Sequence, residues 1–119
     1  MNPEKQFENK VKQFLKDQNC WFVKYWSGAA QNGRKYTKDG VPDLLVCCNG
    51  FFLAIELKAE NGKPSKLQLW NIDKIREAGG IAIVLYPHQF GAFKSLVWQL
   101  QEFLHHSATT EQHYFDWKG

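Results

Sequence analysis

Two apolar runs joined by Asn49-Gly50 constrain the fold of this 119-residue chain more than any other feature of its sequence. Residues 43–48 and 51–58 have the length and side chains of strands. Asn-Gly between such runs is the strongest short-range signal for a hairpin with a two-residue type I′ turn. This turn fixes the register, which sets Asp43 opposite Glu56. The sequence therefore predicts an antiparallel hairpin with two carboxylates at its open end.

The other elements are predicted from apolar periodicity, capping residues and turn residues. Ser65 and Gln68 form a capping box that opens a central helix. The strand after this helix is expected to lie parallel to the second hairpin strand through a right-handed crossover. The expected α-β-β-β-α-β-α order gives an α/β fold with a mixed four-stranded sheet flanked by helices. The expected elements are helices over residues 3–17, 66–78 and 90–104, strands over residues 21–26, 43–48, 51–58 and 81–86, and a long loop over residues 27–40.

Length and composition limit the class of protein. We expect a single domain over residues 1–119, and 44% apolar and 15% aromatic residues exclude intrinsic disorder, collagen and coiled coils. No apolar run reaches the roughly 18 residues of a membrane span, and no signal-peptide pattern is present. The cysteines and histidines lack the spacing of a zinc site. The cysteines are expected to be reduced thiols. We therefore expect a soluble cytoplasmic protein of a phage, a virus or a bacterial host, with no membrane contact and no small-molecule cofactor.

The net charge of +3 hides an uneven distribution along the chain. Residues 1–38 contain eight Lys or Arg against three Asp or Glu, whereas residues 39–119 contain seven against nine. A basic front third suits a polyanion such as nucleic acid. A solvated, lysine-rich first helix would give the same count, so the charge distribution alone does not decide the partner.

The open end of the hairpin has the chemistry of a metal site. Lys58 lies two residues beyond Glu56 and thus on the same face of the strand, beside both carboxylates. Two facing acids repel each other unless a cation lies between them, and carboxylate oxygens suit Mg²⁺ or Mn²⁺. Such an ion polarises a phosphate and activates water. The alternative is an ordinary surface salt bridge at a solvent-exposed strand end.

Gly40-Val41-Pro42-Asp43, followed after twelve residues by Glu56-Leu57-Lys58, resembles the PD-(D/E)XK nuclease signature, most closely that of the VRR-NUC (virus-type replication-repair nuclease) family. The resemblance covers residues 4–86 and includes a first-helix glutamate, Glu8, and the Ser-x-x-Gln segment that ends at Gln68. It implies a restriction-endonuclease-like core and a catalytic site made of Asp43, Glu56, Lys58, Glu8 and Gln68. The implied ligands of Mg²⁺, for which Mn²⁺ substitutes, are Asp43, Glu56, Glu8 and the backbone carbonyl of Leu57.

The function implied by this resemblance is that of a metal-dependent DNA endonuclease. Its substrate would be branched or junction DNA in replication, recombination or repair, and a homodimer would suit a four-way (Holliday) junction. The alternative is a catalytically inactive nucleic-acid-binding module of the same fold. Trp26 and Tyr36 are candidates for stacking on a base. The candidate phosphate contacts are Lys24, Arg34, Lys35, Lys38, Lys63 and Lys66.

Overall fold

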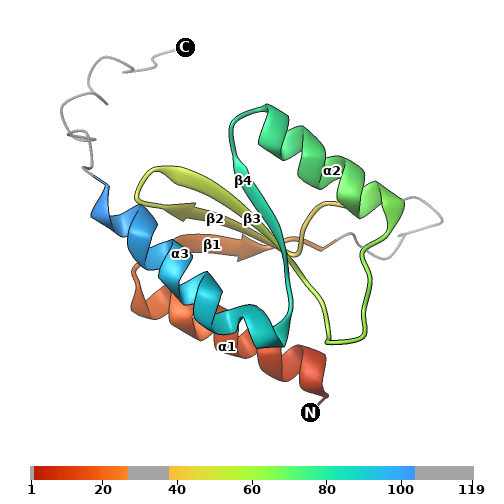
Figure 1. The fold of residues 1–119 in the computed structure, drawn as a ribbon, viewed down its shortest axis with the longest axis horizontal. Coiled ribbons are helices and arrows are strands. Elements are labelled where there is room, and N and C mark those ends of the chain that lie inside the picture. The colour runs from red at the N-terminus through yellow and green to blue at the C-terminus, as the bar shows by residue number, and fades with distance from the viewer. Residues whose placement is uncertain (1, 27–37, 104–119) are drawn as a thin grey trace.

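The structure of the chain, a computed structural model, describes residues 2–26 and 38–103 (Figure 1). Its elements follow the predicted order, with a short 3-10 helix before the last helix. All four strands are one or two residues shorter than predicted, and Leu104, the expected end of the last helix, lies outside the described residues. The helices are α1 (Pro3–Asp17), α2 (Lys66–Glu77), the 3-10 helix η1 (Pro87–Gln89) and α3 (Phe90–Glu102), and the strands are β1 (Trp21–Lys24), β2 (Leu44–Cys48), β3 (Phe51–Leu57) and β4 (Ile81–Leu85).

The four strands form one mixed sheet in the order β1-β2-β3-β4. β1, β2 and β3 pair antiparallel, and β4 pairs with β3 in parallel, as the intervening helix predicted. α1 and α3 lie on one face of the sheet and α2 on the other (Figure 1). The predicted α/β fold with a mixed, helix-flanked sheet is confirmed. Within residues 2–26 and 38–103, no helix is long and apolar enough to cross a membrane.

The two faces of the sheet have different cores. Between the sheet and the α1–α3 layer, aromatic side chains pack edge to face, with the Phe14 and Phe93 ring centroids 5.9 Å apart. The smaller core beneath α2 contains Ala54, Ile72 and Ala82. Since side chains alternate along a strand, Glu56 lies on the same face as Ala54, and its carboxylate therefore lies on the side covered by α2.

The predicted hairpin turn is present at Asn49-Gly50. Both residues have positive φ, 49° and 85°, as a type I′ turn requires. The strands pair in the predicted register, but the pairing ends at Leu44 opposite Ile55, one residue short of the predicted Asp43–Glu56 pair. Asp43 precedes β2, and its side-chain Oδ2 accepts a 2.8 Å hydrogen bond from the Leu57 backbone N–H. The expectation that the two acids are directly opposed strand residues is therefore wrong.

Gly40 allows the segment before Asp43 to approach α2 closely. Its φ is +77°, and a Cβ at this position would lie 2.6 Å from Leu67 Cγ and 2.9 Å from Asn71 Nδ2. The Asn71 amide donates hydrogen bonds to the carbonyls of Leu67 and Asp39, which joins the same segment to the helix. Gly40 therefore sets the distance between the start of β2 and the helix that carries Gln68.

We predict that Gly40→Ala destabilises the protein more than Gly50→Ala does. Both substitutions place a Cβ at positive φ, which costs about 1 kcal/mol, but a Cβ on Gly50 meets nothing within 4 Å. Gly40→Ala must also displace α2, so we expect a total loss of about 2 kcal/mol or more. Urea unfolding of both variants measures the difference. Equal losses would show that the close approach at Gly40 contributes nothing.

Candidate active site

The side chain of Glu56 is the most deeply buried charged group of the candidate site, with 2% of the residue exposed. One carboxylate oxygen, Oε2, accepts a 2.8 Å hydrogen bond from Gln68 Nε2 and lies 3.2 Å from Lys58 Nζ. The other oxygen, Oε1, is buried and has no hydrogen-bond partner among the residues that the structure describes. A buried carboxylate oxygen without a donor is costly, so this atom marks a place for an additional positive ligand.

The burial of Glu56 changes its protonation. Removal from water, together with the nearby charge of Asp43, raises the pKa of Glu56 from 4.5 to about 7, and Lys58 only partly opposes this shift. The alternative of a surface salt bridge at a solvent-exposed strand end is therefore wrong for this residue. A buried acid whose pKa is raised by a neighbouring carboxylate is in the electrostatic setting that a divalent cation relieves.

Asp43 is held in place by the backbone on both sides. Its side chain accepts the 2.8 Å hydrogen bond from Leu57 N–H, and its carbonyl accepts a 2.7 Å bond from Tyr25 N–H. Burial raises the pKa of Asp43, while the Leu57 N–H and the charge of Lys58 act in the opposite direction. One carboxylate oxygen is thus fixed by the end of β3, beside Glu56.

Gln68 has both of the roles that its spacing suggested. Its Oε1 accepts a 2.8 Å hydrogen bond from Ser65 N–H, and Ser65 Oγ accepts from Gln68 N–H, which completes the predicted capping box at the start of α2. Its Nε2 donates to Glu56. A single amide therefore fixes the beginning of the helix and orients the buried carboxylate.

Glu8 on α1 is surrounded by lysines. Lys5, Lys12 and Lys24 donate to its carboxylate at 2.9, 3.1 and 2.7 Å. Burial raises its pKa, but these three hydrogen bonds outweigh that effect and bring the pKa to about 2, so the group stays ionised. Among residues 2–26 and 38–103, no three His, Cys, Asp or Glu side chains form a group that could hold one ion. The binding of a metal by Glu8 therefore stays a prediction.

The sequence reasoning missed the lysines around Glu8. Two of them, Lys5 and Lys12, lie three residues before and four after it, and this helical spacing could have revealed the pairs. The third, Lys24, pairs with Glu8, and its contact with phosphate stays a prediction. Lys38, Lys63 and Lys66 are exposed, and their contact with phosphate stays a prediction. Arg34, Lys35 and Tyr36 lie outside the described residues.

The Asp43–Glu56 pair fits a divalent metal ion by its donor set. Two partly or fully buried carboxylates, one with an unpartnered oxygen, are hard oxygen ligands of the kind that Mg²⁺ and Mn²⁺ prefer. The carbonyl of Leu57 follows Glu56 on β3, within the same short segment. These residues would hold the ion.

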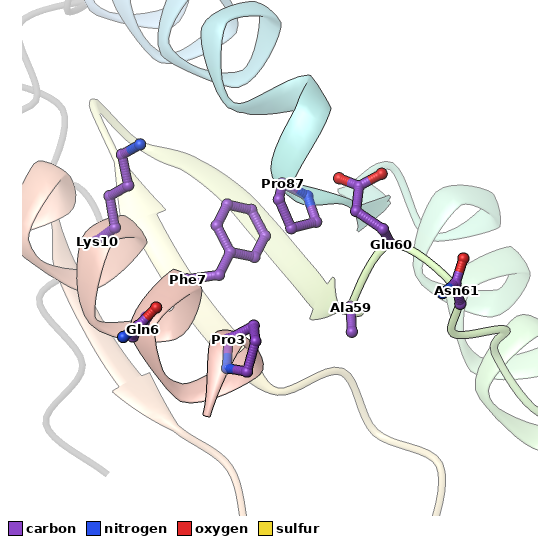
Figure 2. Close-up of a pocket in the computed structure, with 8 residues that line it drawn as sticks. All are labelled: Pro3, Gln6, Phe7, Lys10, Ala59, Glu60, Asn61 and Pro87. Atoms are coloured by element: carbon purple, nitrogen blue, oxygen red, sulfur yellow. The ribbon is translucent and has the colours of Figure 1, made fainter. Parts of the chain in front are cut away.

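A separate pocket of about 520 Å³ lies between α1 and the segment that follows β3 (Figure 2). In the close-up, Phe7 of α1 points toward Pro87, with Ala59 and Glu60 opposite. Its lining is mainly apolar, and its one carboxylate, Glu60, lies 2.7 Å from Nδ1 of His88. This pocket contains none of the predicted site residues and has no pair of acids, so it is not the candidate active site.

A comparison with solved structures agrees with this fold. A structure described as "VRR_NUC domain" matches the chain with a TM-score of 0.57 and 24% sequence identity, over 87% of this chain and 99% of that one. The sequence matches no family model and no curated protein. The chain therefore has the fold of a VRR_NUC domain, which confirms, at the level of the fold, the resemblance found in the sequence.

We predict that the metal-free wild-type protein loses stability as the pH rises through neutrality, and that Glu56→Gln abolishes the part of this loss that comes from Glu56. Because the folded pKa of Glu56 is about 7 and its ordinary value is 4.5, the folded state binds more protons in this window. The contribution of Glu56 to the free energy of unfolding therefore decreases as the pH rises through this window. Relative to wild type, Glu56→Gln should gain roughly 3 kcal/mol between about pH 5 and about pH 8.

Urea unfolding in EDTA at both pH values measures this difference. The comparison of two pH values cancels any packing effect of the substitution that does not depend on pH. If the stability difference between Glu56→Gln and wild type is equal at both pH values, the surroundings of Glu56 do not disfavour its charged form.

Proposed function

We propose that the chain is a member of the VRR-NUC family and a metal-dependent DNA endonuclease that hydrolyses phosphodiester bonds. The observation that carries this proposal is the buried Glu56 carboxylate, one oxygen of which has no donor, beside Asp43 and Lys58 on a VRR_NUC fold. A purely structural acid at this position would have both oxygens satisfied.

Each residue of the site has a role that follows from its contacts. Asp43 and Glu56 bind the ion, and Gln68 keeps the Glu56 carboxylate oriented through its 2.8 Å hydrogen bond. Lys58, whose ammonium group lies 3.2 Å from Glu56, is placed to orient the attacking water or to stabilise charge on the phosphate. When bound, Mg²⁺ supplies a Lewis acid for the phosphate and lowers the pKa of the water.

The distribution of lysines supports a phosphate-rich substrate. Lys5, Lys12 and Lys24 surround one carboxylate, Glu8, so this cluster keeps an excess of positive charge. Exposed Lys63 lies in the segment that connects β3 to α2, and exposed Lys66 is the first residue of α2. We propose branched DNA in replication, recombination or repair as the substrate, and a homodimer as the form that cuts a four-way junction, because a two-fold assembly matches a symmetric junction.

We expect the purified protein to cut DNA in Mg²⁺ or Mn²⁺ and not in Ca²⁺ or EDTA. Asp43→Ala, Glu56→Ala and Lys58→Ala should each reduce the rate roughly a hundredfold or more, since each removes a group that acts on the reacting phosphate or its ion. The assay compares linear, flap and four-way junction DNA of equal length on a denaturing gel.

Glu77→Ala is the matched control, because Glu77 is an exposed carboxylate on α2 that pairs with Lys74 at 3.4 Å. This variant should cut like wild type. If wild type leaves every DNA intact in Mn²⁺ but binds it with an affinity that falls as salt rises, the chain is a binding module and not a nuclease.

A further inference from the structure

Two exposed tryptophans lie on the segments that carry the candidate active site. Trp26 follows β1 and is 67% exposed, and Trp70 on α2 is 49% exposed. Large aromatic side chains are usually buried when they serve only the core, so this exposure needs another explanation. Neither residue belongs to the two apolar cores of the sheet.

Trp26 is connected to the site by short contacts of its neighbours. The ammonium group of Lys24 lies 4.3 Å from the centroid of the Trp26 ring and also donates to Glu8. Trp70 lies two residues after Gln68 on α2, so its ring points away from the Gln68 side chain and toward solvent. The backbone N–H of Tyr25, the residue before Trp26, donates to the carbonyl of Asp43. Trp26 therefore lies beside the segment that holds Asp43.

Positive charge accompanies each ring. Lys38 and Lys74 lie 5.7 and 5.5 Å from the Trp70 ring centroid, and the Lys38 carbonyl accepts a 2.7 Å hydrogen bond from the Tyr25 hydroxyl. This last bond connects the Trp70 side to the Trp26 side. An exposed aromatic ring beside ammonium groups has the two features that bind an unpaired nucleotide: a surface for stacking and a charge for the neighbouring phosphate.

We propose that Trp26 and Trp70 stack on unpaired bases of a strand that passes beside the segment leading to Asp43, so that the protein recognises single-stranded DNA or the splayed strand of a branch. The proposal rests on the proposed nuclease site, because it brings the bound strand to Asp43. Bases inside a duplex have both faces covered by neighbouring base pairs and offer no such surface.

The test measures binding without cutting. Fluorescence anisotropy with a labelled 12-nucleotide oligo(dT), and with a labelled 12-base-pair duplex, is carried out in Ca²⁺. Trp26→Ala and Trp70→Ala should each weaken binding of oligo(dT) about tenfold, and leave binding of the duplex within about twofold. Trp26→Phe and Trp70→Phe should recover most of the affinity, because phenylalanine also stacks.

Trp98 provides the matched control. It is 46% exposed and lies 5.9 Å from Lys94, but it is on α3, where it packs against Phe14. Trp98→Ala should bind oligo(dT) within about twofold of wild type. Equal effects of all three alanine variants, or equal losses for oligo(dT) and duplex, would overturn the proposal.

The outcome is separable from that of the nuclease proposal. Selective loss of oligo(dT) binding in a protein that cuts no DNA in Mg²⁺ or Mn²⁺ would support the stacking role and reject catalysis. Cutting that persists while neither tryptophan affects oligo(dT) binding would reject the stacking role alone. Thermal unfolding monitored by circular dichroism establishes that each variant is folded before its affinity is compared.

Discussion

The burial of Glu56 on the second-to-last strand of the sheet is the constraint on which the rest of the site depends. A carboxylate removed from water needs positive charge and hydrogen bonds, and Lys58 and Gln68 supply both to one of its oxygens only. Gln68 reaches Glu56 because α2 begins at the Ser65 cap, and α2 can lie so close to the start of β2 because Gly40 leaves room for it. A capping box and a glycine therefore decide the surroundings of a buried acid.

Local signals predicted the parts of the fold that local interactions determine. The positive φ of Asn49 and Gly50 fixed the turn, and the hairpin register followed from it. The register failed only at the open end, because the Asp43 side chain accepts from the Leu57 N–H and leaves the ladder. Whether Asp43 pairs as a strand residue or accepts a hydrogen bond through its side chain depends on how three segments pack together. The alternation of side chains along one strand carries no information about that packing.

The same distinction applies to the site. The spacing of Glu56, Lys58 and Gln68 could be recognised because β3 and the cap of α2 are local elements. The pairing of Lys24 with Glu8, sixteen residues earlier, requires β1 to pass beside α1, and the exposure of Trp70 depends on where α2 lies on the sheet. Within the basic front third of the sequence, Lys5, Lys12 and Lys24 pair with Glu8. Lys24 and Lys38 also lie beside the two tryptophans.

The central claim is that Asp43 and Glu56 form a pocket for a divalent cation. Calorimetric titration of Mn²⁺ into the metal-free protein near neutral pH, without DNA, tests it most directly. We predict that wild type and Glu77→Gln bind Mn²⁺, and that Glu56→Gln and Asp43→Asn do not, since each loses a charged ligand. Wild type that binds no Mn²⁺, or Glu56→Gln that binds it as tightly as wild type does, would contradict the account.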